Sequence, residues 1–126
     1  MALARGWQAF EQGDLDATAR EAYACLEQAP QCVDALFLLG SVAFDQGDLA
    51  QARARFQEAV RSGARVLGLG EDPVGQVAFW AQAETRPFLR AHHALAQVLW
   101  ALGERAVAVA MAREHLRWAP RDEQGV

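Results

Sequence analysis

Phe10-Glu11-Gln12-Gly13-Asp14-Leu15 and Phe44-Asp45-Gln46-Gly47-Asp48-Leu49 are two versions of one six-residue stretch. They differ only in the acidic residue at the second position, and their glycines lie 34 residues apart. A fixed period of about 20–50 residues indicates a repeat architecture. Gly-Asp is typical of one helix ending and another beginning, because glycine tolerates positive φ and aspartate caps free N–H groups. The stretch therefore predicts repeated helical hairpins.

Apolar residues at helical spacing extend outward from both turns. The expected helices are residues 2–12, 15–29, 33–46, 49–61, 86–102 and 104–119. Gly103 provides a third turn, 56 residues after Gly47, so about 22 extra residues separate the second hairpin from the third. Because β-branched and aromatic residues never alternate over the length of a strand, the chain is predicted to be all-α.

Glycines inside the expected helices carry further information. Gly40 lies mid-helix, where glycine costs about 1 kcal/mol relative to alanine. We expect it to mark a place where a neighbouring helix approaches too closely for a side chain, and Gly6, one period earlier, to do the same. Ser62-Gly63 is expected to end the fourth helix.

The pattern of small and large apolar residues resembles the tetratricopeptide repeat. In the second repeat the family positions fall on Leu36, Leu39-Gly40, Ala43, Gly47, Ala52, Phe56 and Ala59. The resemblance implies a right-handed α-α superhelix, a TPR-like solenoid of three helical hairpins, within a single domain spanning residues 1–126. Repeat 1 is placed at about 2–30, repeat 2 at about 33–63 and repeat 3 at about 87–120.

An insert at about 65–86 departs from the family pattern. Residues 64–70 are expected to form a loop, and Asp72-Pro73 is a good helix start, with aspartate as the cap and proline in the first helical position. A short helix over 73–83 would then carry Phe79 and Trp80. Loops of this length inside a compact domain usually serve a function or form a small element of their own.

Composition narrows the classes of partner. The chain has 12 basic residues, 16 acidic residues and a net charge of −4, with no basic patch, so we expect no nucleic-acid partner. Every basic residue is arginine, as is typical of a GC-rich bacterial genome. With no signal peptide and no apolar run of about 18 residues, we expect no membrane association and a cytoplasmic location.

The sequence offers little for catalysis or metal binding. His92 and His93 are adjacent on a helix and point about 100° apart, so the i, i+4 zinc spacing is absent. Cys25 and Cys32 are interpreted as structural. Gly68-Leu69-Gly70 lacks the lysine of a phosphate loop. We therefore expect no enzyme activity, no catalytic residue, no metal and no cofactor.

The best candidate site follows from the resemblance, which implies that the first helix of each hairpin lines a concave groove. A protein or peptide partner would bind there. The rim would carry charges from aspartate and arginine, and the walls would be aromatic. The groove residues so implied are Trp7, Phe10, Asp34, Phe37, Ser41, Phe44, Asp45, Arg90, His93, Gln97 and Trp100.

Three occupants of this groove remain open on the sequence alone. A partner peptide or subunit is the first, the insert folding back through Phe79 and Trp80 is the second, and a small apolar ligand is the third. The alternative function is a ligand-binding or enzymatic pocket between groove and insert, around Arg90, His93 and Trp80. The last helix has no polar capping helix after it. We therefore expect the chain to be part of a longer protein, or a second subunit to cover this end as a homo-oligomer.

Overall fold

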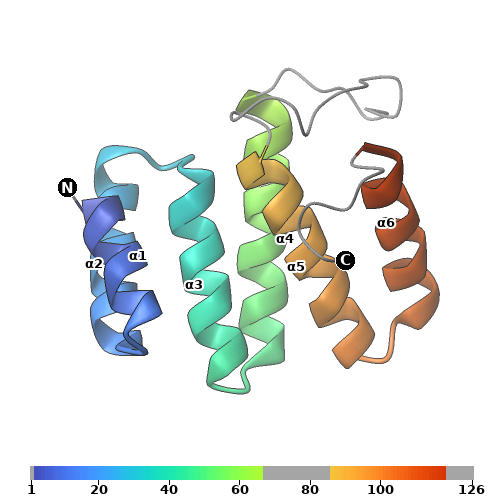
Figure 1. The fold of residues 1–126 in the computed structure, drawn as a ribbon, viewed down its shortest axis with the longest axis horizontal. Coiled ribbons are helices and arrows are strands. Elements are labelled where there is room, and N and C mark those ends of the chain that lie inside the picture. Colours follow the sequence, from blue (N-terminus) through green and yellow to red (C-terminus); the bar gives the residue numbers. More distant parts are fainter. Residues whose placement is uncertain (1, 67–85, 119–126) are drawn as a thin grey trace.

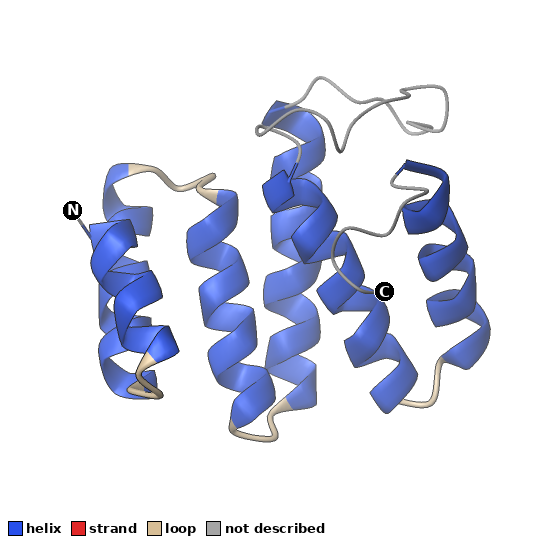
Figure 2. Cartoon of the chain, viewed as in Figure 1, coloured by secondary structure: helices blue, strands red, loops and turns tan. Residues whose placement is uncertain are grey.

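The computed structural model describes residues 2–66 and 86–118, which form α-helices joined by short turns and contain no strand (Figures 1 and 2). This confirms the all-helical prediction. The helices are α1 (Ala2–Glu11), α2 (Leu15–Gln28), α3 (Val33–Asp45), α4 (Leu49–Val66), α5 (Arg86–Ala101) and α6 (Arg105–Trp118). None of these helices combines the length and the apolar character that spanning a bilayer would need.

The three turns inside the hairpins share one geometry. Gly13, Gly47 and Gly103 have φ values of 76°, 80° and 89°, in the left-handed region that favours glycine. In each turn the glycine N–H donates to the carbonyl three residues earlier, and the next N–H donates to a carbonyl five residues earlier. This pattern satisfies carbonyl groups at the end of the first helix.

Aspartate then starts the second helix of the first two hairpins. The Asp14 carboxylate accepts a hydrogen bond from the Ala17 N–H at 3.1 Å, and Asp48 accepts one from the Gln51 N–H at 3.1 Å. In the third hairpin Glu104 occupies this position, and its carboxylate instead pairs with Arg53 of α4 at 2.7 Å. The cap predicted from Gly-Asp is therefore present in both hairpins whose turn contains that pair.

The hairpins stack side by side, so that each helix packs against the helices before and after it in the chain (Figure 1). In addition, α3 contacts both α1 and α5. The first helices of the three hairpins therefore form one continuous layer, as in a helical solenoid. This layer presents the residues that the sequence assigned to a groove.

The core is made of small and aliphatic residues between successive hairpins. Leu36, Leu38, Leu89 and Val98 are fully buried. At Gly40 of α3 the Phe56 side chain of α4 packs directly on the helix backbone, because a Cβ atom there would lie 2.6 Å from Cε1 of Phe56. At Gly6 a Cβ atom would lie 3.2 Å from Cδ1 of Leu38. Both glycines thus lie where neighbouring helices crowd, as predicted, but the crowding is much tighter at Gly40.

The predicted end of the fourth helix was wrong. Helix α4 continues through Ser62-Gly63 to Val66, so Ala64–Val66 are helical rather than part of a loop. Gly63 is buried because Phe88 of α5 packs directly on it, and a Cβ atom would lie 3.0 Å from Cδ1 of that ring. The glycine therefore makes room for a helix instead of ending one. The predicted helix over 73–83 lies outside the described residues.

Candidate binding surface

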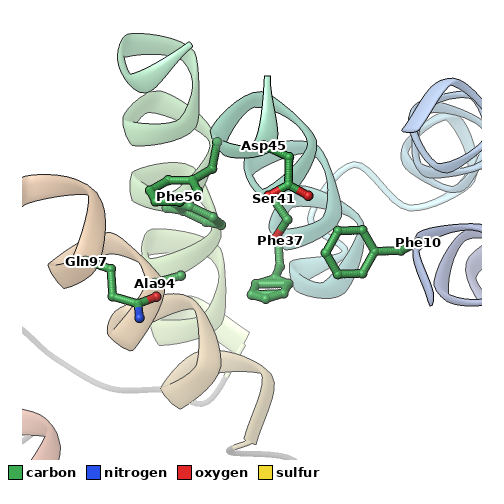
Figure 3. Close-up of a pocket in the computed structure, with 8 residues that line it drawn as sticks. Phe10, Phe37, Ser41, Asp45, Phe56, Ala94 and Gln97 are labelled. Atoms are coloured by element: carbon green, nitrogen blue, oxygen red, sulfur yellow. The ribbon is translucent and has the colours of Figure 1, made fainter. Parts of the chain in front are cut away.

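A hollow of about 130 Å³ opens between α1, α3, α4 and α5. Figure 3 shows Phe10 extending from α1 towards Phe37 of α3, while Gln97 enters from α5 on the other side. Polar atoms come from a hydroxyl, an amide and one carboxylate, and none of the residues lining the hollow is basic. The lining residues are Phe10, Phe37, Ser41, Phe44, Asp45, Phe56, Ala94 and Gln97.

The aromatic side chains of this hollow are held at different depths. Phe56 forms its floor and is 2% exposed, whereas Phe44 is 39% exposed. Phe10 and Phe37 are half-buried. A cavity of about 150 Å³ is large enough for a benzene ring. The hollow, at about 130 Å³, is slightly smaller, so it has room for the end of one bulky apolar side chain, which would touch aromatic surface that now faces solvent.

The depth of Phe56 depends on a residue across the helix interface. Its ring lies against Gly40, at a distance that no larger residue would permit. The ring then contacts Phe37, with ring centres 5.7 Å apart. Phe56 is a core residue in the sequence prediction, and neither Phe56 nor Ala94 is among the predicted groove residues. The mid-helix position of Gly40 is the feature of the sequence that indicated this contact, because the glycine leaves room for the Phe56 side chain of α4 to extend past α3 into the hollow.

A second cluster continues the surface beyond Phe37. Trp7 stacks on Phe37 with ring centres 5.8 Å apart and an interplanar angle of 28°. The Arg90 guanidinium lies over both rings, 5.2 Å from the centre of Trp7 and 5.8 Å from that of Phe37. Its Nη1 also donates to Oδ1 of Asp34 at 3.0 Å. Arg90 of α5 thus connects α1 and α3.

Burial governs the electrostatics of this cluster. The pKa of Asp34 is raised above its ordinary value by desolvation, although the neighbouring Arg90 acts to lower it. The attraction of the ion pair therefore does not fully offset the cost of taking the carboxylate out of water. Arg90 forms an ion pair with Asp34 and lies over two aromatic rings. Its charge is therefore used in contacts within the protein.

Two more of the predicted groove residues, His93 and Trp100, lie in a separate hollow of about 420 Å³ between α5 and α6. Trp100 is 50% exposed there, and the Arg105 guanidinium lies 4.9 Å from its ring centre. Gln97 lines both hollows and separates them. The lining is almost entirely apolar and consists of His93, Ala96, Gln97, Trp100, Ala108, Val109 and Ala112.

The sequence prediction of a single cleft is thus resolved into three adjoining parts. Most of the predicted residues line the first hollow, namely Phe10, Phe37, Ser41, Phe44, Asp45 and Gln97. Trp7, Asp34 and Arg90 form the adjoining cluster. His93 and Trp100 lie in the second hollow. Phe79 and Trp80 lie outside the described residues.

The other residues considered for chemistry are placed as follows. His92 is 4% exposed, and its Nε2 lies 3.3 Å from Oε1 of Glu114 on α6. Within residues 2–66 and 86–118, no group of three or more histidine, cysteine, aspartate or glutamate side chains is arranged to hold a metal ion. Arg90 and His93, which the alternative function would use together, face different parts of the surface.

Comparison with known families agrees with this geometry. Residues 9–65 match the family model described as Tetratricopeptide repeat. These residues belong to the tetratricopeptide repeat family. The match covers α2, α3 and most of α4, together with the last turn of α1. Beyond it, the α5–α6 hairpin repeats the turn geometry of the matched tetratricopeptide repeats. No curated protein matches the chain. Tetratricopeptide repeats generally mediate protein–protein interactions.

Proposed function

We propose that this chain is a non-catalytic interaction module whose first hollow accepts a bulky apolar side chain from a partner peptide. The observation that carries the proposal is the exposed face of Phe44 beside the half-buried rings of Phe10 and Phe37. Fully burying a phenylalanine side chain stabilises by about 1.5–3 kcal/mol, so covering the exposed part of Phe44 would contribute about 1 kcal/mol. A partner side chain in the hollow would add a comparable amount of its own.

The charges of the hollow favour a basic neighbour to this anchor. Asp45 is exposed at the rim, and Ser41 and Gln97 supply further acceptors. None of the lining residues is basic, and the nearby Arg90 is paired with Asp34. A peptide that carries arginine or lysine next to its apolar anchor would therefore meet complementary charge, whereas glutamate in that place would meet repulsion.

A peptide array tests this proposal. The probes are helical and extended peptides with one phenylalanine, leucine or tryptophan anchor, followed by arginine, alanine or glutamate. We expect the arginine series to bind best. Phe44→Asp should abolish binding while the helical circular dichroism signal stays intact, and Asp45→Asn should remove the preference for arginine over alanine.

The matched control is Tyr23→Asp. Tyr23 is 49% exposed and lies on α2, where its hydroxyl interacts with Arg55 away from the hollow. The Tyr23→Asp substitution introduces the same negative charge at an exposed aromatic position, but outside the hollow, so binding should be retained. Equal loss in Phe44→Asp and Tyr23→Asp, or full binding by Phe44→Asp, would contradict the proposal.

A separate observation supports contact with a second copy of the chain. Of the large hydrophobic side chains most exposed in the described residues, Trp100, Leu102, Val107 and Val109 all lie at the α5–α6 end. Concentrated apolar surface of this kind usually marks an interaction site. We expect sedimentation equilibrium to show self-association, and Val109→Glu to weaken it. A concentration-independent monomer mass for the wild type would contradict this second proposal and leave the peptide site unaffected.

A further inference from the structure

The chain contains two cysteines, and the fold brings them together. Cys25 lies in the last turn of α2, and Cys32 is the residue immediately before α3. Their Sγ atoms lie 3.5 Å apart, at hydrogen-bonding distance for two thiols. Both are free thiols of intermediate exposure. The pair is therefore only partly covered by the rest of the protein, and its two sulfur atoms lie in contact.

The backbone between the two residues is held by its own hydrogen bonds. The Ala29 N–H donates to the Cys25 carbonyl at 2.9 Å, and the Cys32 N–H donates to the Ala29 carbonyl at 3.0 Å. The Leu36 N–H in turn donates to the Cys32 carbonyl at 3.2 Å. These bonds fix the positions from which both side chains extend. Forming the bond requires the sulfur separation to fall from 3.5 Å to about 2.05 Å, a change to which rotation of both side chains would contribute.

We propose that Cys25 and Cys32 are a redox-modification site, at which a small disulfide such as oxidised glutathione converts the dithiol into an intramolecular disulfide. The thiolate of one cysteine attacks oxidised glutathione, forms a mixed disulfide and expels one glutathione thiolate. The thiolate of the second cysteine attacks the protein sulfur of that mixed disulfide and expels the other. Both cysteines are oxidised, one oxidised glutathione is reduced to two glutathione molecules, and the two protons pass to solvent or to the departing thiolates.

The local environment of Cys25 lowers the rate of this exchange. Burial raises the pKa of Cys25 to about 11, with smaller contributions from Cys32 and from the Asp34 carboxylate. The thiolate is the attacking species, and Cys25 has to attack in one of the two steps whichever cysteine reacts first. Exchange is therefore expected to be slow at neutral pH.

The bond would act on the junction between the first two hairpins. Cys25 and Cys32 both pack against the apolar cluster that contains Leu38 and Leu39 of α3. A disulfide would join the end of α2 to the start of α3 and restrict the unfolded chain. For a loop this short, the constraint is expected to raise Tm by about 5–10 °C.

The test uses the purified, reduced chain exposed to oxidised glutathione over a range of ratios to reduced glutathione. After acid quenching and alkylation, intact mass should show a species that has lost two hydrogens and resists alkylation. Peptide mapping should place the bond between Cys25 and Cys32. Thermal unfolding of this species should show the higher Tm, and reduction should restore the original value.

Cys25→Ser and Cys32→Ser are the matched controls. Each retains one thiol, so we expect a glutathione adduct on the remaining cysteine and no rise in Tm. Glutathione adducts on both cysteines of the wild type, covalent dimers in place of the internal bond, or an internal bond that leaves Tm unchanged would each overturn the proposal.

Discussion

Gly40 makes room on α3 for the Phe56 ring of α4, and replacing the glycine by alanine tests that interpretation directly. A Cβ atom at this position would lie 2.6, 2.7 and 3.0 Å from Cε1, Cδ1 and Cζ of Phe56. Carbon atoms pack best at about 3.5–4.0 Å, so the ring would have to move by about 1 Å. The ring is 2% exposed and rests against Phe37, so it has little room to retreat.

Two opposing effects set the magnitude. Overpacking of a core typically costs about 1–3 kcal/mol, and a displacement of this size belongs at the upper end. Alanine gains about 1 kcal/mol over glycine in helix propensity. We therefore expect Gly40→Ala to lower the free energy of unfolding by about 1–2 kcal/mol, and Tm by about 4–8 °C. Urea denaturation followed by circular dichroism measures the difference.

Two further variants separate crowding from a general effect of alanine. At Gly6 the Cβ atom would meet only Cδ1 of Leu38 at 3.2 Å and Cβ of Glu21 at 3.5 Å. Gly6→Ala should therefore stay within about 0.5 kcal/mol of the wild type, because the propensity gain offsets a small displacement. In a Phe56→Leu background, Gly40→Ala should no longer destabilise, which a double-mutant cycle would show. A Gly40→Ala protein about 1 kcal/mol more stable than the wild type would refute the reasoning, because propensity alone predicts that value.

Variants at Asp48, Arg90 and Asp34 test three further contacts. Asp48→Ala should lower the free energy of unfolding by about 1 kcal/mol in urea denaturation, because the Gln51 N–H loses the carboxylate that caps it. A change near zero would contradict this prediction. Arg90→Met should cost about 1–2 kcal/mol, since it leaves the half-buried Asp34 carboxylate without its partner, and a value near zero would show that the pair contributes nothing. Because burial raises the folded-state pKa of Asp34 above 3.8, its protonation favours the folded state. The stability of the wild type relative to Asp34→Asn should therefore be greatest below pH 3.8 and fall as pH rises through the folded-state pKa of Asp34. Denaturation of both proteins at several pH values measures this difference, and a difference that increases with pH would contradict the prediction.

Much of the fold follows from local sequence because its determinants are local. A glycine with φ near 80° and an aspartate that accepts a hydrogen bond from the N–H three residues later require no distant partner. Helical spacing of apolar residues depends only on neighbours within two turns. The positions of Phe10, Phe44 and Trp100 follow as well, because each carbonyl accepts a hydrogen bond from the glycine N–H of its turn.

The helix boundary at Gly63 shows where this reasoning fails. Glycine is equally compatible with the end of a helix and with a close contact inside one. The residue that decides between them, Phe88, belongs to the next hairpin. No pattern within the fourth helix carries that information.

The composition of the candidate binding surface was likewise decided by tertiary structure. Phe56 reaches the first hollow only because Gly40 lets its ring pass, and Trp100 falls in a different hollow from Phe44 because α6 packs beside α5. The cluster of Trp7, Asp34 and Arg90 joins three helices through residues far apart in the chain. The sequence by itself determined the helices, their turns and the aromatic residues before each turn, since these depend on backbone preference and helical spacing. Only the packing of hairpin upon hairpin decided which of those aromatics share a cavity, how deeply each is buried and which charges stay available, because these properties depend on distances between segments that the local sequence does not specify.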